Sequence, residues 1–233
     1  MGALFSFGLA AGFALRSPYL RAQTSLEMPQ GPLKLTRRIE RSMRGGAMLT
    51  VERSWQVRFV KQGQGIAIQG EQVEAKVDAP QSLAPLADLE ERRSTEQMWP
   101  ILLGSNGMIL SAGMSLLEED LAEAVRLARQ MVSERAIPAD QRASQMQYMG
   151  DLQQASSTLL DRLPDDLFYP SIGPMRAVRS IDLPQGLVGQ FELSYLAQAV
   201  PEKGWLDRAE RQIISRIGGS VRTAREEWIL RDI

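Results

Sequence analysis

The chain has 233 residues, 27 basic and 28 acidic side chains and a formal charge of -1, and 44% of its residues are hydrophobic. This composition is that of a folded domain, and it argues against binding nucleic acid, which needs a concentrated positive field. The chain contains no cysteine and no histidine, which excludes disulfides, thiolate nucleophiles, a Ser-His-Asp triad and a zinc site built on these ligands.

The first residues form an uncharged, largely apolar run, Leu4 to Leu15, which ends at Arg16. Such a run is too short to cross a bilayer but suits the core of a signal peptide. No basic residue precedes it and its cleavage patterns are imperfect, so a membrane tether or an unprocessed buried segment is the alternative. We expect residues 1–23 to be a signal peptide or N-terminal hydrophobic segment, followed by a single α+β domain over residues 24–233. The expected location is periplasmic or secreted.

The first part of the domain has the alternation of β-strands. Apolar residues from Leu49 to Phe59 alternate with polar ones, as in a strand with one face in a core. Glycine turns at 45–46 and 63–65 bound this strand. A preceding strand carries Leu33, Leu35 and Ile39. In the following strand the apolar residues lie at even positions before Gly70 and at odd positions after it, which predicts a bulge or a further turn there.

The middle of the chain has helical spacing. Ser82 is predicted to cap a short helix with Leu83, Leu86 and Leu89 facing inward. Residues 101–103 and 108–110 flank a Gly-Ser-Asn-Gly turn and predict a small hairpin. A capping box at Ser115 opens a helix that reaches Val132, and a second helix spans residues 140–163. These two predict a helical hairpin.

The last part returns to strands. Residues 187–197 alternate, and 181–183 is the expected hairpin partner across Pro184-Gln185-Gly186. Residues 209–217 and 221–230 are joined by Gly218-Gly219-Ser220. The predicted fold class is therefore α+β: an antiparallel, curved β-sheet formed by two β-rich halves and packed against an inserted α-helical hairpin.

The sequence offers no specific catalytic, metal-binding or cofactor-binding motif. Three acidic pairs are the remaining option for a carboxylate-dependent hydrolase: Glu90-Glu91, Asp165-Asp166 and Glu226-Glu227. Neighbouring residues on a strand or helix point in different directions, so these pairs more simply serve solubility. We predict no catalytic residue and no cofactor.

Basic residues concentrate between residues 16 and 61. Arg37, Arg38, Arg41 and Arg44 could contact anionic lipid headgroups, or they could form a solvated sheet edge. Arg53 interrupts an apolar strand face and, if buried, needs an acidic partner, for which Glu192 or Glu226 are candidates.

Eleven methionines and four tryptophans could line an apolar pocket or fill a plain core. The predicted ligand-binding residues are Trp55, Phe59, Arg53, Met146, Met149 and Trp228. The predicted function is non-catalytic binding of an apolar or lipid-like small molecule, or of a protein partner at the cell envelope. A carboxylate-dependent hydrolase and a purely structural module are the alternatives. The oligomeric state cannot be predicted.

Overall fold

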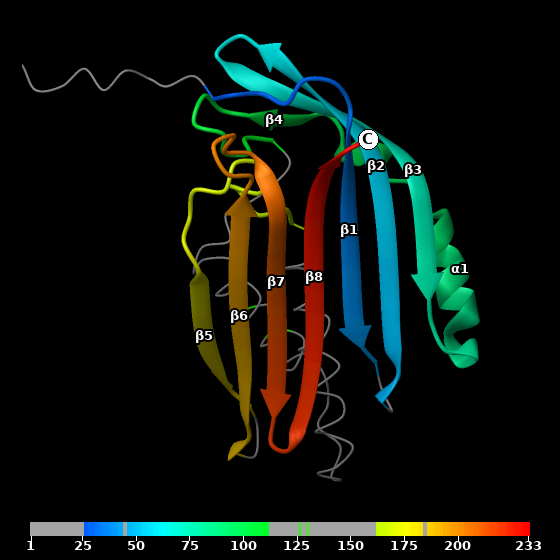
Figure 1. Ribbon diagram of the computed structural model, residues 1–233. Helices are drawn as coiled ribbons and strands as arrows, with labels where there is room; N and C mark the ends of the chain where they lie inside the picture. Colours follow the sequence, from blue (N-terminus) through cyan, green and yellow to red (C-terminus); the bar gives the residue numbers. More distant parts are fainter. Residues whose placement is uncertain (1–25, 44–45, 112–125, 127–129, 131–161, 184–185) are drawn as a thin grey trace, which may run out of the picture.

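The computed structural model of the chain describes residues 26–43, 46–111, 126, 130, 162–183 and 186–233. Its centre is an open, antiparallel eight-stranded sheet with the order β4-β3-β2-β1-β8-β7-β6-β5 (Figure 1). The strands are β1 (Leu33–Ser42), β2 (Met48–Gln62), β3 (Gly65–Asp78), β4 (Ile101–Leu103), β5 (Met175–Asp182), β6 (Val188–Ala199), β7 (Leu206–Ile217) and β8 (Ser220–Asp232). The predicted strands of both β-rich halves are thus confirmed.

Each half of the sheet opens with a hairpin of the same construction. The Met43 amide donates to the Ala47 carbonyl (2.7 Å), and the Leu183 amide donates to the Leu187 carbonyl (2.8 Å). Gly46 and Gly186 occupy equivalent positions with φ of 80° and 73°, a backbone conformation that favours glycine. Strand β1 of the first half then pairs with β8 of the second, which joins the halves into one sheet.

The two faces of the sheet differ as the alternation predicts. On the outer face, acidic and basic side chains pair across the strands, as in the Arg225–Glu210 pair at 2.7 Å. On the inner face lie two apolar clusters. The larger one contains Trp55, Trp228, the buried ends of β3 and β4, and the 163–169 segment. The smaller one lies at the opposite end of β6, β7 and β8 and includes Phe191, Leu193 and Ile213.

The irregularity predicted in β3 is present but lies elsewhere. The register between β2 and β3 shifts opposite Ser54 and Trp55, where Glu74 and Gln72 are the successive partners, so Val73 is the extra residue. Gly70 itself pairs regularly with Val57. Beyond this bulge the ends of β2 and β3 bend over the top of the sheet, where β4 lies (Figure 1).

The short predicted helix is α1 (Ala84–Arg92), preceded by a 3-10 turn (Gln81–Leu83) and followed by a second one (Glu96–Met98). Its predicted cap is wrong: Leu83 holds the N-cap position and no side chain caps the helix. The inward orientation of Leu89 is also wrong, since this residue is 70% exposed. Apart from residues 126, 130, 162 and 163, the predicted helical hairpin of residues 115–163 lies outside the described residues, as does the N-terminal hydrophobic segment. Among the described residues, no helix is long and apolar enough to span a membrane.

Gly70 is required by the packing of Trp99. A Cβ atom at position 70 would lie 2.4 Å from the Trp99 ring, which is closer than carbon atoms can approach. We therefore expect Gly70→Ala to lower the free energy of unfolding by about 1–3 kcal/mol, measured by urea denaturation. Gly219→Ala is the matched control, because no atom lies within 4 Å of its Cβ position. An unchanged midpoint for Gly70→Ala would contradict this packing.

Candidate binding pocket

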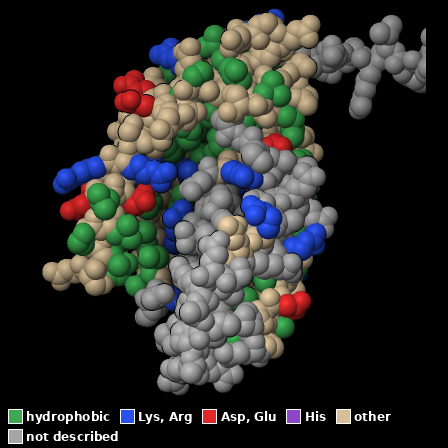
Figure 2. All heavy atoms as spheres, turned by 180° about the vertical axis from the view of Figure 1, so that it is seen from behind, with side chains coloured by type: hydrophobic (Ala, Val, Ile, Leu, Met, Phe, Trp, Pro, Cys, Tyr) green, Lys and Arg blue, Asp and Glu red, His purple; other side chains and the backbone are tan. Residues whose placement is uncertain are grey.

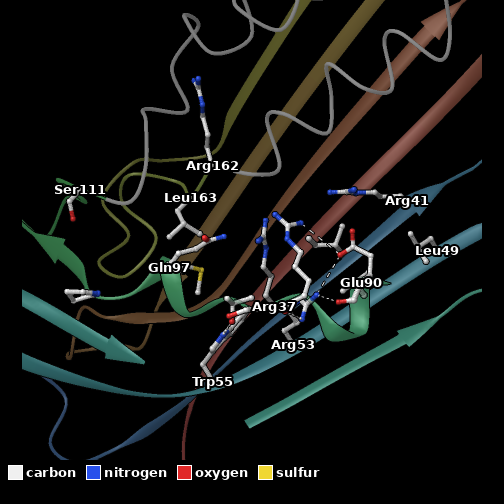
Figure 3. Close-up of a pocket in the computed structure, with 17 residues that line it drawn as sticks. Arg37, Arg41, Leu49, Arg53, Trp55, Glu90, Gln97, Ser111, Arg162 and Leu163 are labelled. Carbon is white, nitrogen blue, oxygen red and sulfur yellow. Dashed lines mark hydrogen bonds and ion pairs between the residues drawn. The ribbon is translucent and has the colours of Figure 1, made fainter. Parts of the chain in front are cut away.

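A pocket of about 550 Å³ opens on the inner face of the sheet, in the size range of small-molecule sites. The inner sides of β1 and β2 form one wall and the segment after α1 forms another (Figure 3). Seen from behind the sheet, basic side chains gather beside a hollow on this face (Figure 2). The described lining residues are Arg37, Ile39, Arg41, Leu49, Val51, Arg53, Trp55, Glu90, Arg93, Ser94, Thr95, Gln97, Met98, Pro100, Ser111, Arg162 and Leu163.

The lining combines an apolar surface with arginine side chains. Ile39, Leu49, Val51, Trp55 and Met98 supply aliphatic and aromatic surface. Five of the described lining residues are arginines, and Glu90 is the one carboxylate among them. The pocket thus has the two properties that a ligand with an apolar body and a negatively charged end requires.

Arg37 is held at the pocket wall by a buried ion-pair cluster. Its guanidinium pairs with Glu226 of β8, and the same carboxylate accepts a 2.7 Å hydrogen bond from Nε of Arg211 on β7. Glu226 and Arg211 are both fully buried. Arg37 also lies over the Trp228 ring, 4.7 Å from its centroid, a favourable cation–π contact.

Further polar contacts extend this cluster across the sheet. Nη2 of Arg211 donates to the Arg162 carbonyl at 2.8 Å. Tyr195, the cross-strand partner of Arg211, donates its hydroxyl to Asp166 at 3.0 Å. Burial, and then the adjacent Asp166 charge, raise the pKa of Tyr195 well above its usual value. This buried polar row therefore separates the two apolar clusters of the inner face.

Arg53 fastens the C-terminal end of α1 to the sheet. Its side chain donates to the Glu90 carbonyl and, at 3.2 Å, to the Arg93 carbonyl. It also pairs with the Glu90 carboxylate at 3.6 Å. A cation that binds the last carbonyls of a helix stabilises its C-terminal end. Burial is the main cause that lowers the pKa of Arg53, and the nearby charges of Arg93 and Arg37 act in the same direction.

A second set of hydrogen bonds holds the segment after α1. The Trp55 indole donates to the Thr95 hydroxyl at 2.8 Å, and that hydroxyl donates to Gln72 at 2.7 Å. Trp55 also stacks on Trp228, with ring centroids 6.3 Å apart. Two strands of the sheet thereby position the wall of the pocket that contains Thr95 and Met98.

The structure brings together some of the predicted ligand-binding residues. Arg53 and Trp55 line the pocket, and Trp228, which is not among the described lining residues, stacks against Trp55. Phe59 is not among the described lining residues and packs instead edge-on against Phe168 and Tyr169. Met146 and Met149 lie outside the described residues.

The predicted partners of Arg53 are wrong. Arg53 pairs with Glu90 of α1, whereas Glu226 pairs with Arg37 and Arg211. Glu192 lies on the outer face, where hydrogen bonds from Arg216 and Arg176 lower its pKa. The alternation identified Arg53 as buried but could not show that a helix beyond the sheet supplies its partner.

The basic residues of β1 do not form one surface patch. Arg37 and Arg41 line the pocket, whereas Arg38 faces the other side of the sheet and pairs with Glu40 at 2.9 Å. Arg44 lies outside the described residues. The proposed membrane contact through these four arginines therefore has no common surface in the described part of the chain.

The sequence did not identify Arg93 and Arg162 as pocket residues, Arg211 as a buried residue, or Glu90 as the partner of Arg53. Arg211 carried a usable signal, because it lies between Ala209 and Ile213 on the apolar parity of its strand, as Arg53 does in β2. Arg93 and Arg162 lie outside strands and carried none. Within the described ranges, no group of three or more acidic side chains could hold a metal ion.

Comparisons with known proteins do not assign this chain to a family. No protein-family model matches it, and no curated protein matches it. A solved structure described as lipid–protein interactions in lipovitellin is similar over 86% of this chain and 25% of that chain, with 9% identity and a TM-score of 0.29. This chain thus spans about a quarter of the length of the lipovitellin chain. A similarity this low carries no argument about function. The fold and the pocket themselves define the class of protein: an open antiparallel sheet with an arginine-lined pocket.

Proposed function

We propose that the protein binds an amphiphilic small molecule with a negatively charged end and does not act on it chemically. The observation that carries the proposal is the lining of the pocket, where five arginines accompany Trp55, Val51 and Leu49. Guanidinium groups bind carboxylates and phosphates through paired hydrogen bonds. The adjoining apolar wall would bury the hydrocarbon part of the ligand and supply most of the affinity.

The lining carboxylate Glu90 and the buried Glu226 next to Arg37 both form ion pairs, which fits binding better than hydrolysis. Glu90 contacts Arg53 and Arg93, and Glu226 lies between Arg37 and Arg211. Carboxylates fixed between arginines in this way hold those side chains in place. The ion-paired Glu90 and Glu226 therefore give the hydrolase alternative no support.

A fluorescent fatty acid tests the proposal. We expect 11-(dansylamino)undecanoic acid to bind the full-length protein saturably at one site, with a blue-shifted emission and with displacement by oleate. Arg93→Glu should weaken binding at least about tenfold, because it replaces a charge-assisted contact by a repulsive one. Arg93 is 57% exposed, so folding should be unaffected.

Arg92→Glu is the matched control. Arg92 is the exposed neighbouring residue and is not among the described lining residues, so it changes the net charge equally without changing the pocket. Equal losses of affinity in the two variants would show that the ligand responds only to the net charge of the protein and not to the pocket. Such a result, or the absence of saturable binding, would contradict the proposed site.

We also propose that the protein acts in the periplasm or outside the cell. The support is the apolar run from Leu4 to Leu15. N-terminal sequencing of the protein recovered from cell fractions tests this proposal.

A further inference from the structure

We infer that the ligand is a monoanion with one hydrocarbon chain of about eleven carbons, its charged end at Arg53 and Arg93 and its chain directed along β2 to Leu49. This inference rests on the proposed function and specifies the ligand class of the same pocket. It follows from the order of the lining residues along the two strands that form the pocket floor.

The floor of the pocket consists of three successive rows of cross-strand partners on β1 and β2. The rows are Arg37 with Arg53, Ile39 with Val51, and Arg41 with Leu49. Figure 3 shows Leu49 and Trp55 on opposite sides of Arg53. The floor therefore has an arginine pair with apolar residues before and after it along β2.

The pocket extends farther from Arg53 toward Leu49 than toward Trp55. Trp55 is the next inner-facing residue on one side, and Val57 beyond it is fully buried and is not among the described lining residues. On the other side both Val51 and Leu49 line the pocket. A hydrocarbon chain that starts at Arg53 thus has its longer path on β2 toward Leu49.

The distance along β2 sets the length of that chain. A strand rises about 3.4 Å per residue, so the path over the four residues from Arg53 to Leu49 is about 14 Å long. An extended hydrocarbon chain, with bonds of about 1.5 Å at tetrahedral angles, advances about 1.25 Å per carbon. About eleven carbons therefore cover the path. Ala47, beyond Leu49, is not among the described lining residues, so a longer chain passes the end of this floor.

The volume of the pocket limits the ligand to one such chain. A methylene group occupies about 30 Å³, close to the share of one water molecule in the liquid. The pocket of about 550 Å³ thus holds about 18 groups of this size. That volume accommodates one chain of this length with its charged group, but not two such chains.

The charge at the Arg53 end of the path matches a ligand with one negative charge. The Glu90 carboxylate lies 3.6 Å from Arg53 and 4.0 Å from Arg93, so these three side chains together carry one excess positive charge. The Arg93 side chain is 57% exposed and is therefore accessible to a ligand. A carboxylate compensates this charge and can accept paired hydrogen bonds from a guanidinium group.

Isothermal titration of the full-length protein with straight-chain alkanoates from hexanoate to octadecanoate tests the inference. We expect the affinity to rise about fourfold with each added carbon up to about eleven carbons, because each of these methylenes is buried. Beyond that length the affinity should change less than about twofold per carbon, because the added carbons lie past Leu49.

Two variants test the position of the chain. Leu49→Gln should lower the affinity for undecanoate at least about tenfold and leave that for hexanoate within about twofold, because only the longer chain reaches position 49. Leu89→Gln is the matched control and should change neither affinity, since Leu89 is 70% exposed on α1 and is not among the described lining residues.

The outcomes separate this inference from the proposed function. An affinity that keeps rising up to octadecanoate, or tighter binding of the two-chain lipid didecanoyl phosphatidylglycerol than of decanoate, would overturn the single chain of this length and leave amphiphile binding standing. A greater loss of undecanoate binding with Arg41→Gln than with Arg93→Gln would overturn the orientation. An affinity independent of chain length, or no binding of any alkanoate, would overturn both proposals.

Discussion

Glu226→Gln is expected to lower the free energy of unfolding by about 3–5 kcal/mol, the cost of removing one partner from a buried ion pair. Glu226 is fully buried and its carboxylate is shared by Arg37 and Arg211. Glutamine keeps the shape of the side chain but removes the negative charge, so two guanidinium groups lose the carboxylate that they share. Urea denaturation followed by circular dichroism measures the loss.

Glu227→Gln provides the control for this experiment. Glu227 is the next residue on β8, faces the outer side of the sheet, and pairs with Arg208, a side chain that is 46% exposed. Solvent-exposed pairs of this kind contribute about 0–1 kcal/mol. A loss for Glu226→Gln no greater than that for Glu227→Gln would contradict the role of the buried cluster.

A double replacement separates charge from packing. We expect Glu226→Leu combined with Arg211→Leu to be less destabilising than Glu226→Leu alone, because the pair of leucines leaves fewer uncompensated charges. If the free energy of unfolding of the double variant falls by the sum of the two single-variant decreases, the two side chains act independently.

The strands could be predicted because one face of the sheet is buried. In β2, the residues from Leu49 to Val57 alternate between buried and partly exposed positions except at Ser54, which is also buried, and this period of two is read directly from the sequence. The bulge was misplaced at Gly70 because the parity change is visible only over several residues. The extra residue, Val73, is exposed, so it is compatible with the alternation before the bulge and with the alternation after it.

The pocket could be predicted only in part, because its residues meet through tertiary contacts. Arg53 and Trp55 belong to one strand and were recognised from its pattern. Glu90 reaches Arg53 from a helix 37 residues away in the sequence, a distance over which a single sequence carries no pairing signal. Arg211 and Glu226 each interrupt an alternating strand, and the two interruptions considered together would have indicated a buried pair.

Arg53→Gln is expected both to destabilise the protein and to disorganise the pocket. The arginine side chain contacts the Glu90 carbonyl, the Arg93 carbonyl and the Glu90 carboxylate at once. Glutamine is shorter and uncharged and cannot make these contacts together. Since none of the residues of α1 is buried, this anchor is a main attachment of the helix end to the sheet. We expect a loss of about 2–4 kcal/mol, from charge-assisted hydrogen bonds of about 1.5–3 kcal/mol each that are only partly replaced.

Hydrogen exchange distinguishes this anchoring role from a general loss of stability. Arg53→Gln should increase amide exchange selectively in α1 and in residues 93–98, while β6 and β7 keep their protection, and amphiphile affinity should fall with it. Arg58→Gln is the control, because Arg58 lies on the same strand but is exposed. Faster exchange throughout the sheet would contradict local anchoring, and unchanged affinity despite a released helix would show that Arg93, Thr95 and Met98 do not form the ligand-binding wall.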